Sequence, residues 1–126
     1  MKKLFSVILI FCSLFAFAQQ SGPAFKFKDA NNTHDFGTVK EGTDAVYSFE
    51  FTNVGNQPIL IQEATSTCGC TTPDWPKAPV LPGKTGKITV KYQTQGRVGP
   101  IDRTVFIKSN ASKTPIELKI TGTVVK

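Results

Sequence analysis

The chain has 126 residues, and 15 lysine and arginine residues against 9 aspartate and glutamate residues give it a formal net charge of +6. This length suits one domain and no more. Its cations are scattered and form no run of five or more, which argues against a nucleic-acid-binding patch.

The first 18 residues have the pattern of a secretory signal peptide. Two lysines follow the first methionine, residues 4–17 are mostly apolar, and Ala16 and Ala18 place small side chains at the positions that precede a cleavage point. We therefore expect cleavage near Ala18-Gln19, so that the mature protein is exported and becomes periplasmic or extracellular.

Two other interpretations of this segment are less well supported by the sequence. A retained membrane anchor would need ~20 apolar residues to cross a bilayer, and this run is shorter. Lipoprotein processing is disfavoured because bulky Phe11 precedes Cys12 where a small residue is needed. No second apolar segment exists, so we expect no transmembrane span in the mature chain. Residues 19–24 are expected to form a short flexible lead.

The mature chain is patterned as short strands separated by turns. Alternating apolar and polar side chains are typical of strands buried on one face. This alternation covers residues 24–28, 47–52, 88–93, 105–108 and 116–121, and residues 58–61 form an apolar run expected to be covered on both faces. About seven strands at intervals of 8–12 residues, without a helical period, predict an immunoglobulin-like antiparallel β-sandwich with Greek-key connections over residues 25–126.

Glycine, asparagine and proline predict where the chain turns. Phe36-Gly37 is expected to end a strand, and Asn53 is expected to cap backbone groups in the turn that follows residues 47–52. Pro82-Gly83 predicts a type II turn with positive φ at Gly83. If the sandwich is correct, residues from several predicted strands must share one interior: Phe49, Ile61, Val90 and Leu118.

Several motifs occur in an order and spacing that resemble a known family. They are Asp35-Phe36-Gly37-Thr38-Val39, Phe49-x-Phe51-x-Asn53-x-Gly55, Cys68-Gly69-Cys70-Thr71-x-Pro73-x-Trp75-Pro76, Pro82-Gly83-x-x-Gly86-x-Ile88, Ser109-Asn110 and Ile120-x-Gly122. Together they resemble the bacterial domain-of-unknown-function 1573 family over residues 25–124. The resemblance implies an exported domain related to the major-sperm-protein, PapD-like and ASH type. It implies no established activity. Many relatives are lipoproteins, and this chain lacks a usable lipobox.

Cys68-Gly69-Cys70 holds the only cysteines that remain after export. Gly69 is expected to bend the backbone so that the two sulfurs meet. Three interpretations stay open: buried, unreactive thiols or an incidental disulfide, a redox-active pair, or a copper or zinc site in which His34 is the one imidazole available. A disulfide here would close a very small loop and stabilise the fold little.

The segment after the cysteines is a candidate binding loop made of Thr71, Pro73, Trp75 and Pro76. An aromatic ring on a loop stiffened by prolines can bind a protein or a glycan, or can pack the loop onto the sandwich. His34, the only histidine, cannot easily cooperate with Asp35 because neighbouring side chains of a strand point to opposite faces.

The sequence therefore favours a non-catalytic binding or assembly module of the cell envelope, with another envelope protein or a glycan as partner. It predicts no enzyme, no nucleic-acid partner and no cofactor. The alternative is a thiol redox or copper-handling protein that uses Cys68 and Cys70. A hydrolase built on His34 and a thiol is a weaker third hypothesis.

Overall fold

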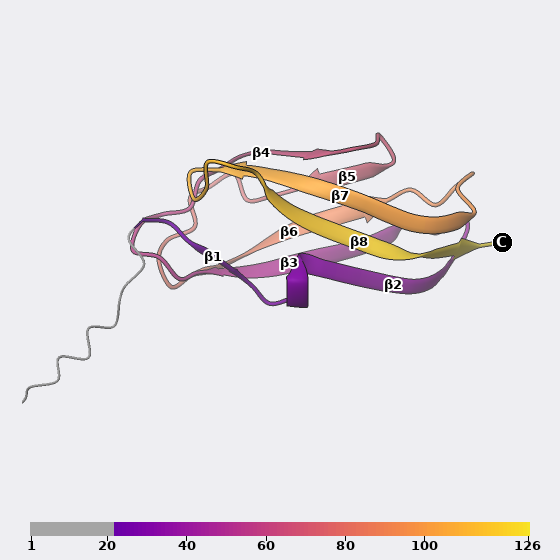
Figure 1. Cartoon of the computed structure of the whole chain (residues 1–126), viewed down its shortest axis with the longest axis horizontal. Coiled ribbons are helices and arrows are strands. Elements are labelled where there is room, and N and C mark those ends of the chain that lie inside the picture. Colours follow the sequence, from indigo (N-terminus) through magenta and orange to yellow (C-terminus); the bar gives the residue numbers. More distant parts are fainter. Residues whose placement is uncertain (1–21) are drawn as a thin grey trace, which may run out of the picture.

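The computed structural model describes residues 22–126 as two four-stranded sheets packed face to face (Figure 1). The predicted signal peptide at residues 1–18 lies outside the described residues, as does the start of the predicted flexible lead. No helix among residues 22–126 is long and apolar enough to span a membrane. The elements in chain order are β1 Phe25–Phe27, the 3-10 turn η1 Ala30–Asn32, β2 Thr33–Lys40, β3 Ala45–Asn53, β4 Ile61–Ser66, β5 Thr71–Asp74, β6 Thr85–Tyr92, β7 Gly99–Ser109 and β8 Ile116–Val125.

The first sheet has the strand order β1-β3-β6-β5 and the second β2-β8-β7-β4. All pairs are antiparallel except β2 with β8, which run parallel. The immunoglobulin-like sandwich is therefore confirmed, with eight strands where about seven were predicted.

The core confirms the predicted alternation. Phe49, Val90 and Leu118 are fully buried between the sheets, and Ile61 packs against them while partly buried. Inward-facing side chains of β3, β6, β7 and β8 supply most of this interior because every second residue of a strand points to the same face. Burial of such apolar surface is the main favourable term for a domain of this size.

One predicted turn is a strand. Phe36-Gly37 lies inside β2, and the pairing of β2 with β8 shifts register between Asp35 and Thr38. Gly37 has a φ of 66°, and its N–H donates to Asp35 Oδ1 at 2.8 Å. The glycine therefore makes a bulge that the strand passes through, rather than a turn that ends it.

The apolar run at residues 58–61 is not a strand covered on both faces. Ile59 is fully buried and forms an isolated bridge with Val80, but Leu60 is 44% exposed. β4 begins only at Ile61. The prediction was wrong because the run spans the end of a loop, where successive side chains have different environments.

The two turns assigned to Asn53 and Gly83 are confirmed. Gly83 has a φ of 79°. The Asn53 side chain is fully buried, accepts the N–H of Gly55 at 3.0 Å, and donates to the carbonyls of Gln57 at 2.7 Å and Val80 at 2.9 Å. It thereby ties the loop after β3 to the loop before β6.

Candidate functional site

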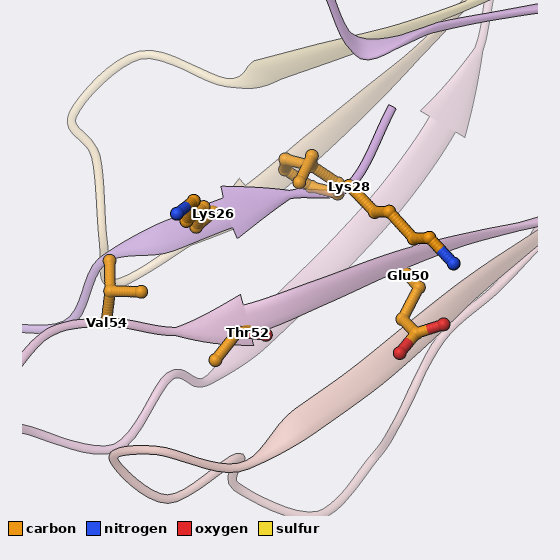
Figure 2. A pocket seen from close by; sticks show the side chains of 6 residues that line it. Lys26, Lys28, Glu50, Thr52 and Val54 are labelled. Carbon is orange, nitrogen blue, oxygen red and sulfur yellow. The ribbon is translucent and has the colours of Figure 1, made fainter. Parts of the chain in front are cut away.

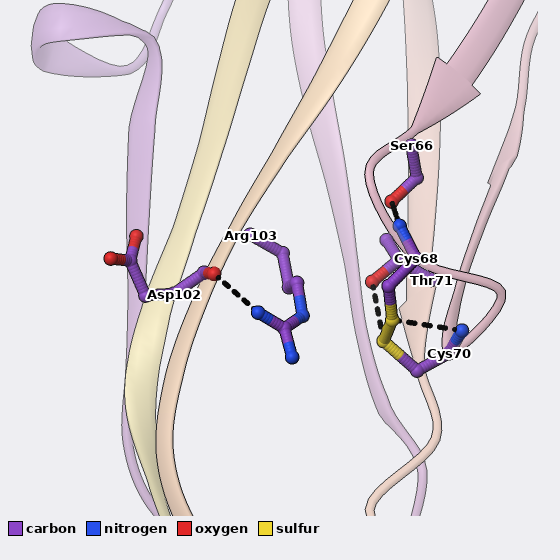
Figure 3. Close-up of a disulfide and its surroundings, with 6 residues drawn as sticks. All are labelled: Ser66, Cys68, Cys70, Thr71, Asp102 and Arg103. Carbon is purple, nitrogen blue, oxygen red and sulfur yellow. Dashed lines mark hydrogen bonds between the residues drawn. A yellow bond between two sulfur atoms is a disulfide. The ribbon is translucent and has the colours of Figure 1, made fainter.

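Cys68 and Cys70 form a disulfide in the turn that joins β4 to β5 (Figure 3). β4 is an edge strand of one sheet and β5 an edge strand of the other, so this turn carries the chain across the side of the sandwich. The Cα atoms of the two cysteines are 5.3 Å apart, within the range that a disulfide tolerates.

The chain bends at Gly69 as expected, in a turn in which the N–H of Thr71 donates to the Cys68 carbonyl at 3.3 Å. Its φ lies outside the positive region, and a Cβ added there would meet no atom within 4 Å other than those of the neighbouring Cys68 and Cys70. The backbone therefore reaches the disulfide geometry without a conformation that needs glycine.

The two cysteines differ in burial and in hydrogen bonding. Cys70 is 2% exposed, while Cys68 is only partly buried. The N–H of Cys70 donates to Cys68 Sγ at 3.0 Å, and the Thr71 hydroxyl lies 3.6 Å from Cys70 Sγ. The Cys70 carbonyl accepts the N–H of Gln93 at 2.9 Å, which fixes the turn to the end of β6.

Arg103 is a functional candidate that the sequence analysis missed. It alternates with the buried residues Ile101 and Val105, so it occupies an inward-facing position of β7. Ser66, the last residue of β4, pairs with Val105, so the cysteine turn follows directly beside Arg103. Figure 3 draws the Arg103 guanidinium among the surroundings of the disulfide.

The guanidinium of Arg103 is incompletely paired. Its Nη1 donates to the carbonyl of Asp102 at 3.0 Å, but its Nε is buried and has no hydrogen-bond partner. Among residues 22–126 it also forms no ion pair with a carboxylate. The signal in the sequence was the alternation Ile101-x-Arg103-x-Val105, which places a cation where an apolar residue is usual.

His34 and the cysteines are not brought together. His34 lies on β2 and the cysteine turn follows β4, and these strands are the opposite edges of one sheet. Three strand spacings of ~4.8 Å separate them by about 14 Å. The described part of the chain also holds no cluster of three or more histidine, cysteine, aspartate or glutamate residues that could bind a metal.

His34 instead belongs to an aromatic cluster between β2 and β3. Its ring stacks on Tyr47 with centroids 3.4 Å apart and meets Phe36 edge-on. The Tyr47 hydroxyl donates to Asp29 Oδ1. This hydrogen bond, with burial and the charges of Asp29 and Glu50, raises the pKa of Tyr47 to about 12. The phenol therefore stays protonated at neutral pH.

The predicted binding loop does not form one exposed surface. Thr71 and Pro73 both lie within β5, where Thr71 is buried and Pro73 pairs with Val90 of β6. Trp75 packs against the core while partly buried, and Lys77 Nζ lies 3.0 Å from its ring centroid. The structure thus supports the packing interpretation of Trp75, whose ring lies between the core and the Lys77 ammonium group.

Three exposed apolar side chains lie at the opposite end of the sandwich from the disulfide, and three others, Val46, Val98 and Val125, are exposed elsewhere. Leu60 is 44% exposed, Leu81 53% and Val54 45%. The Ile59–Val80 bridge holds Leu60 and Leu81 close together. The backbone of Asn53 exchanges hydrogen bonds with the turn after Leu81, which brings Val54 to the same end. We call these three side chains the apolar loop surface.

A shallow hollow of about 350 Å³ adjoins this surface on the outer face of β1 and β3 (Figure 2). Val54 lines it together with a mixture of charged, polar and aromatic side chains: Lys26, Phe27, Lys28, Glu50 and Thr52. The lysines and the glutamate partly balance one another, so the hollow does not select strongly for one sign of charge.

Comparison with known proteins identifies both the family and the fold. A family model described as "Protein of unknown function (DUF1573)" matches residues 25–124. A protein of unknown function from Porphyromonas gingivalis W83 is similar with a TM-score of 0.70 and 17% identity over 84% of this chain and 48% of that one. The chain thus spans about half the length of that structure. No curated protein matches it.

Two further solved structures are similar in fold. The ASH/PapD-like domain 7 of human CEP192 has a TM-score of 0.65 and 10% identity, over 81% of this chain and 85% of that one. The secreted serine protease VesC from Vibrio cholerae has a TM-score of 0.58 and 14% identity, over 82% of this chain but only 23% of that one. At these identities the likeness shows a shared sandwich alone.

Proposed function

Because the chain belongs to the DUF1573 family of proteins of unknown function, we propose its role from its own surfaces: it is a non-catalytic binding or assembly module of the cell envelope. The observation that carries this proposal is the apolar loop surface of Val54, Leu60 and Leu81, where neighbouring loops expose three aliphatic side chains at one end of the sandwich. Its partner is another envelope protein.

The energetics of this surface suit a protein contact. Complete burial of an exposed aliphatic side chain is worth about 1.5–3 kcal/mol, so three half-exposed side chains supply about 3 kcal/mol. That corresponds to a factor of about 100 in affinity. The buried Asn53 side chain holds the loops in place, so little further entropy is lost when a partner binds.

The alternative partner, a glycan, is less well supported. Sugar rings commonly stack on exposed aromatic faces, and the one tryptophan of this chain packs against the core and is covered by Lys77. The exposed large hydrophobic residues of residues 22–126 are valines and leucines. Aliphatic side chains offer a sugar no stacking face, whereas they pack well against another protein.

The envelope location has two supports. One is the signal-peptide pattern of residues 1–18. The other is the Cys68–Cys70 disulfide, since disulfides persist in exported proteins and are rare in the reducing cytosol. Cell fractionation tests whether the protein is exported, and a cysteine-labelling reagent tests whether Cys68 and Cys70 are oxidised in the cell.

Photo-crosslinking in living cells tests the binding surface. A photo-reactive amino acid at Leu60 or Leu81 is expected to give one discrete protein adduct. The matched control is Val98, an equally exposed aliphatic residue in the loop between β6 and β7 at the other end of the sandwich. Failure of both loop positions to give an adduct, or the same adduct from Val98, would refute the assignment of this surface.

A further inference from the structure

We infer that the Cys68–Cys70 disulfide is a thiol–disulfide exchange centre that reacts with cysteine side chains of other exported polypeptides, with Arg103 as a positioning residue that stabilises its reduced form. This leaves the proposed binding role in place but departs from its non-catalytic part, because it assigns a chemical reaction to the end of the sandwich that lies away from the apolar loop surface.

The pair is poorly suited to act as a structural staple. A disulfide stabilises a fold mainly by constraining the unfolded chain, and the constraint grows with the length of the loop that it closes. Cys68 and Cys70 are two positions apart, so the loop is very short. The turn is also held independently by the hydrogen bond from Gln93 N–H to the Cys70 carbonyl.

The unequal burial of the two sulfurs defines a direction of attack. Cys68 is partly exposed while Cys70 is 2% exposed, so an incoming thiolate reaches Cys68 Sγ first. Apart from the two cysteines themselves, no atom lies within 4 Å of the position that a Cβ on Gly69 would take, so no other residue crowds the turn at this point. Exchange needs such access, because a new sulfur must approach the one that it attacks.

The surroundings stabilise each thiolate that exchange releases. The N–H of Cys70 already points at Cys68 Sγ from 3.0 Å, and the Thr71 hydroxyl lies 3.6 Å from Cys70 Sγ. Arg103 adds a cation beside the turn, and its buried Nε has no hydrogen-bond partner. A nearby arginine favours the thiolate over the thiol. Reduction of the disulfide thus provides the negative charge that this guanidinium lacks.

The reaction balances with two thiols of a polypeptide as the reductant. The first, as a thiolate, attacks Cys68 Sγ; the Cys68–Cys70 bond breaks, and its electron pair leaves on Cys70 Sγ, which remains a thiolate beside Arg103. The second thiolate attacks the substrate sulfur of the mixed disulfide and releases Cys68 as a thiolate, which then takes up a proton. The substrate gains a disulfide, the centre gains two electrons and one proton, and the other proton of the two substrate thiols goes to the solvent. A second polypeptide disulfide reoxidises the pair by the reverse steps.

Thiol trapping on the mature protein tests the direction of attack. The oxidised protein is mixed with a synthetic peptide that contains one cysteine, quenched with an alkylating reagent and mapped by mass spectrometry. We expect a mixed disulfide on Cys68, with Cys70 alkylated. An adduct on Cys70, an even mixture, or exchange slower than that of oxidised glutathione with the same peptide would overturn the proposal.

Two substitutions and a control test the surroundings. Gly69→Leu is expected to slow exchange about tenfold by covering the sulfurs. Arg103→Gln is expected to shift the equilibrium with glutathione about tenfold towards the disulfide, because the thiolate loses its cation. Arg97→Gln removes an exposed charge from the loop before β7 and is expected to change nothing. Unfolding of each variant in urea separates loss of structure from loss of reactivity. If Arg103→Gln and Arg97→Gln give the same equilibrium, or if Gly69→Leu exchanges at the rate of the wild type, the proposal is overturned, because Arg103 does not stabilise the reduced pair or access beside Gly69 does not control the exchange.

Discussion

Replacement of Asn53 by alanine should be among the most destabilising polar substitutions in this protein. The side chain is fully buried and makes three hydrogen bonds of ordinary length, to Gly55, Gln57 and Val80, and a longer one of 3.4 Å from the N–H of Ala24. A hydrogen bond contributes about 1 kcal/mol on average, so loss of the three short bonds lowers the free energy of unfolding by about 3 kcal/mol.

Some of the affected groups keep other partners, which limits the loss. The Val80 carbonyl still accepts the N–H of Ile59, and the backbone of Asn53 still pairs with Lys84 and Gly83. We therefore expect no collapse of the fold but a lower melting temperature. For a domain of about 100 residues, 3 kcal/mol corresponds to roughly 12–24 °C.

Urea unfolding followed by tryptophan fluorescence measures this effect, with Asn56→Ala as the control. Asn56 is exposed, and its side chain accepts one hydrogen bond, from Gly22 N–H. Its loss should cost less than about 1 kcal/mol. If Asn53→Ala and Asn56→Ala unfold within that margin of each other, the Asn53 side chain does not hold the loops together as described.

Three shorter predictions concern other parts of the molecule. Absorbance titration should show Tyr47 ionising near pH 12, and Asp29→Asn should lower that pKa; a single transition near pH 10 would contradict this. Because the pKa of Tyr47 is raised in the folded state, its contribution to stability is full below pH 10 and is lost as the pH rises from 10 to 12. Gly86→Ala places a Cβ 2.6 Å from Phe51 Cζ and should lower the free energy of unfolding in urea by about 1–3 kcal/mol. Gly69→Ala should lower it by less than about 0.5 kcal/mol, and equal effects of the two variants would show that Phe51 does not crowd position 86. Reduction of the disulfide should lower the free energy of unfolding by only about 1.5 kcal/mol, because the closed loop is so short, and a loss of more than about 3 kcal/mol would show that it is a structural staple.

The sequence predicted the strands whose alternation is regular. β3, β6 and β8 carry apolar residues at every second position, because one face of each meets the other sheet. β2 was predicted only as a strand ending at Phe36-Gly37, because the bulge at Gly37 breaks its period of two and its buried contacts are partial. β5 has four residues and contains Pro73, so neither its length nor its composition marks it as a strand.

The candidate site was predicted in part. The cysteine pair was evident from spacing and compartment, but its oxidation state and the unequal burial of Cys68 and Cys70 needed coordinates. Arg103 was missed because the predicted strand began two residues later, and only the strand's full length shows that this cation points inward. The apolar loop surface could not be predicted from the alternation of apolar and polar residues, because it depends on how loops that are distant in the sequence meet.

The edges of the first sheet bear on self-association. β1 has three residues and β5 four, and Pro73 in β5 has no N–H to offer a neighbouring strand. Short edges that lack donors are poor templates for the strand of another copy. The segment that leads away from the cysteines therefore also offers a poor template for fibril growth along this sheet.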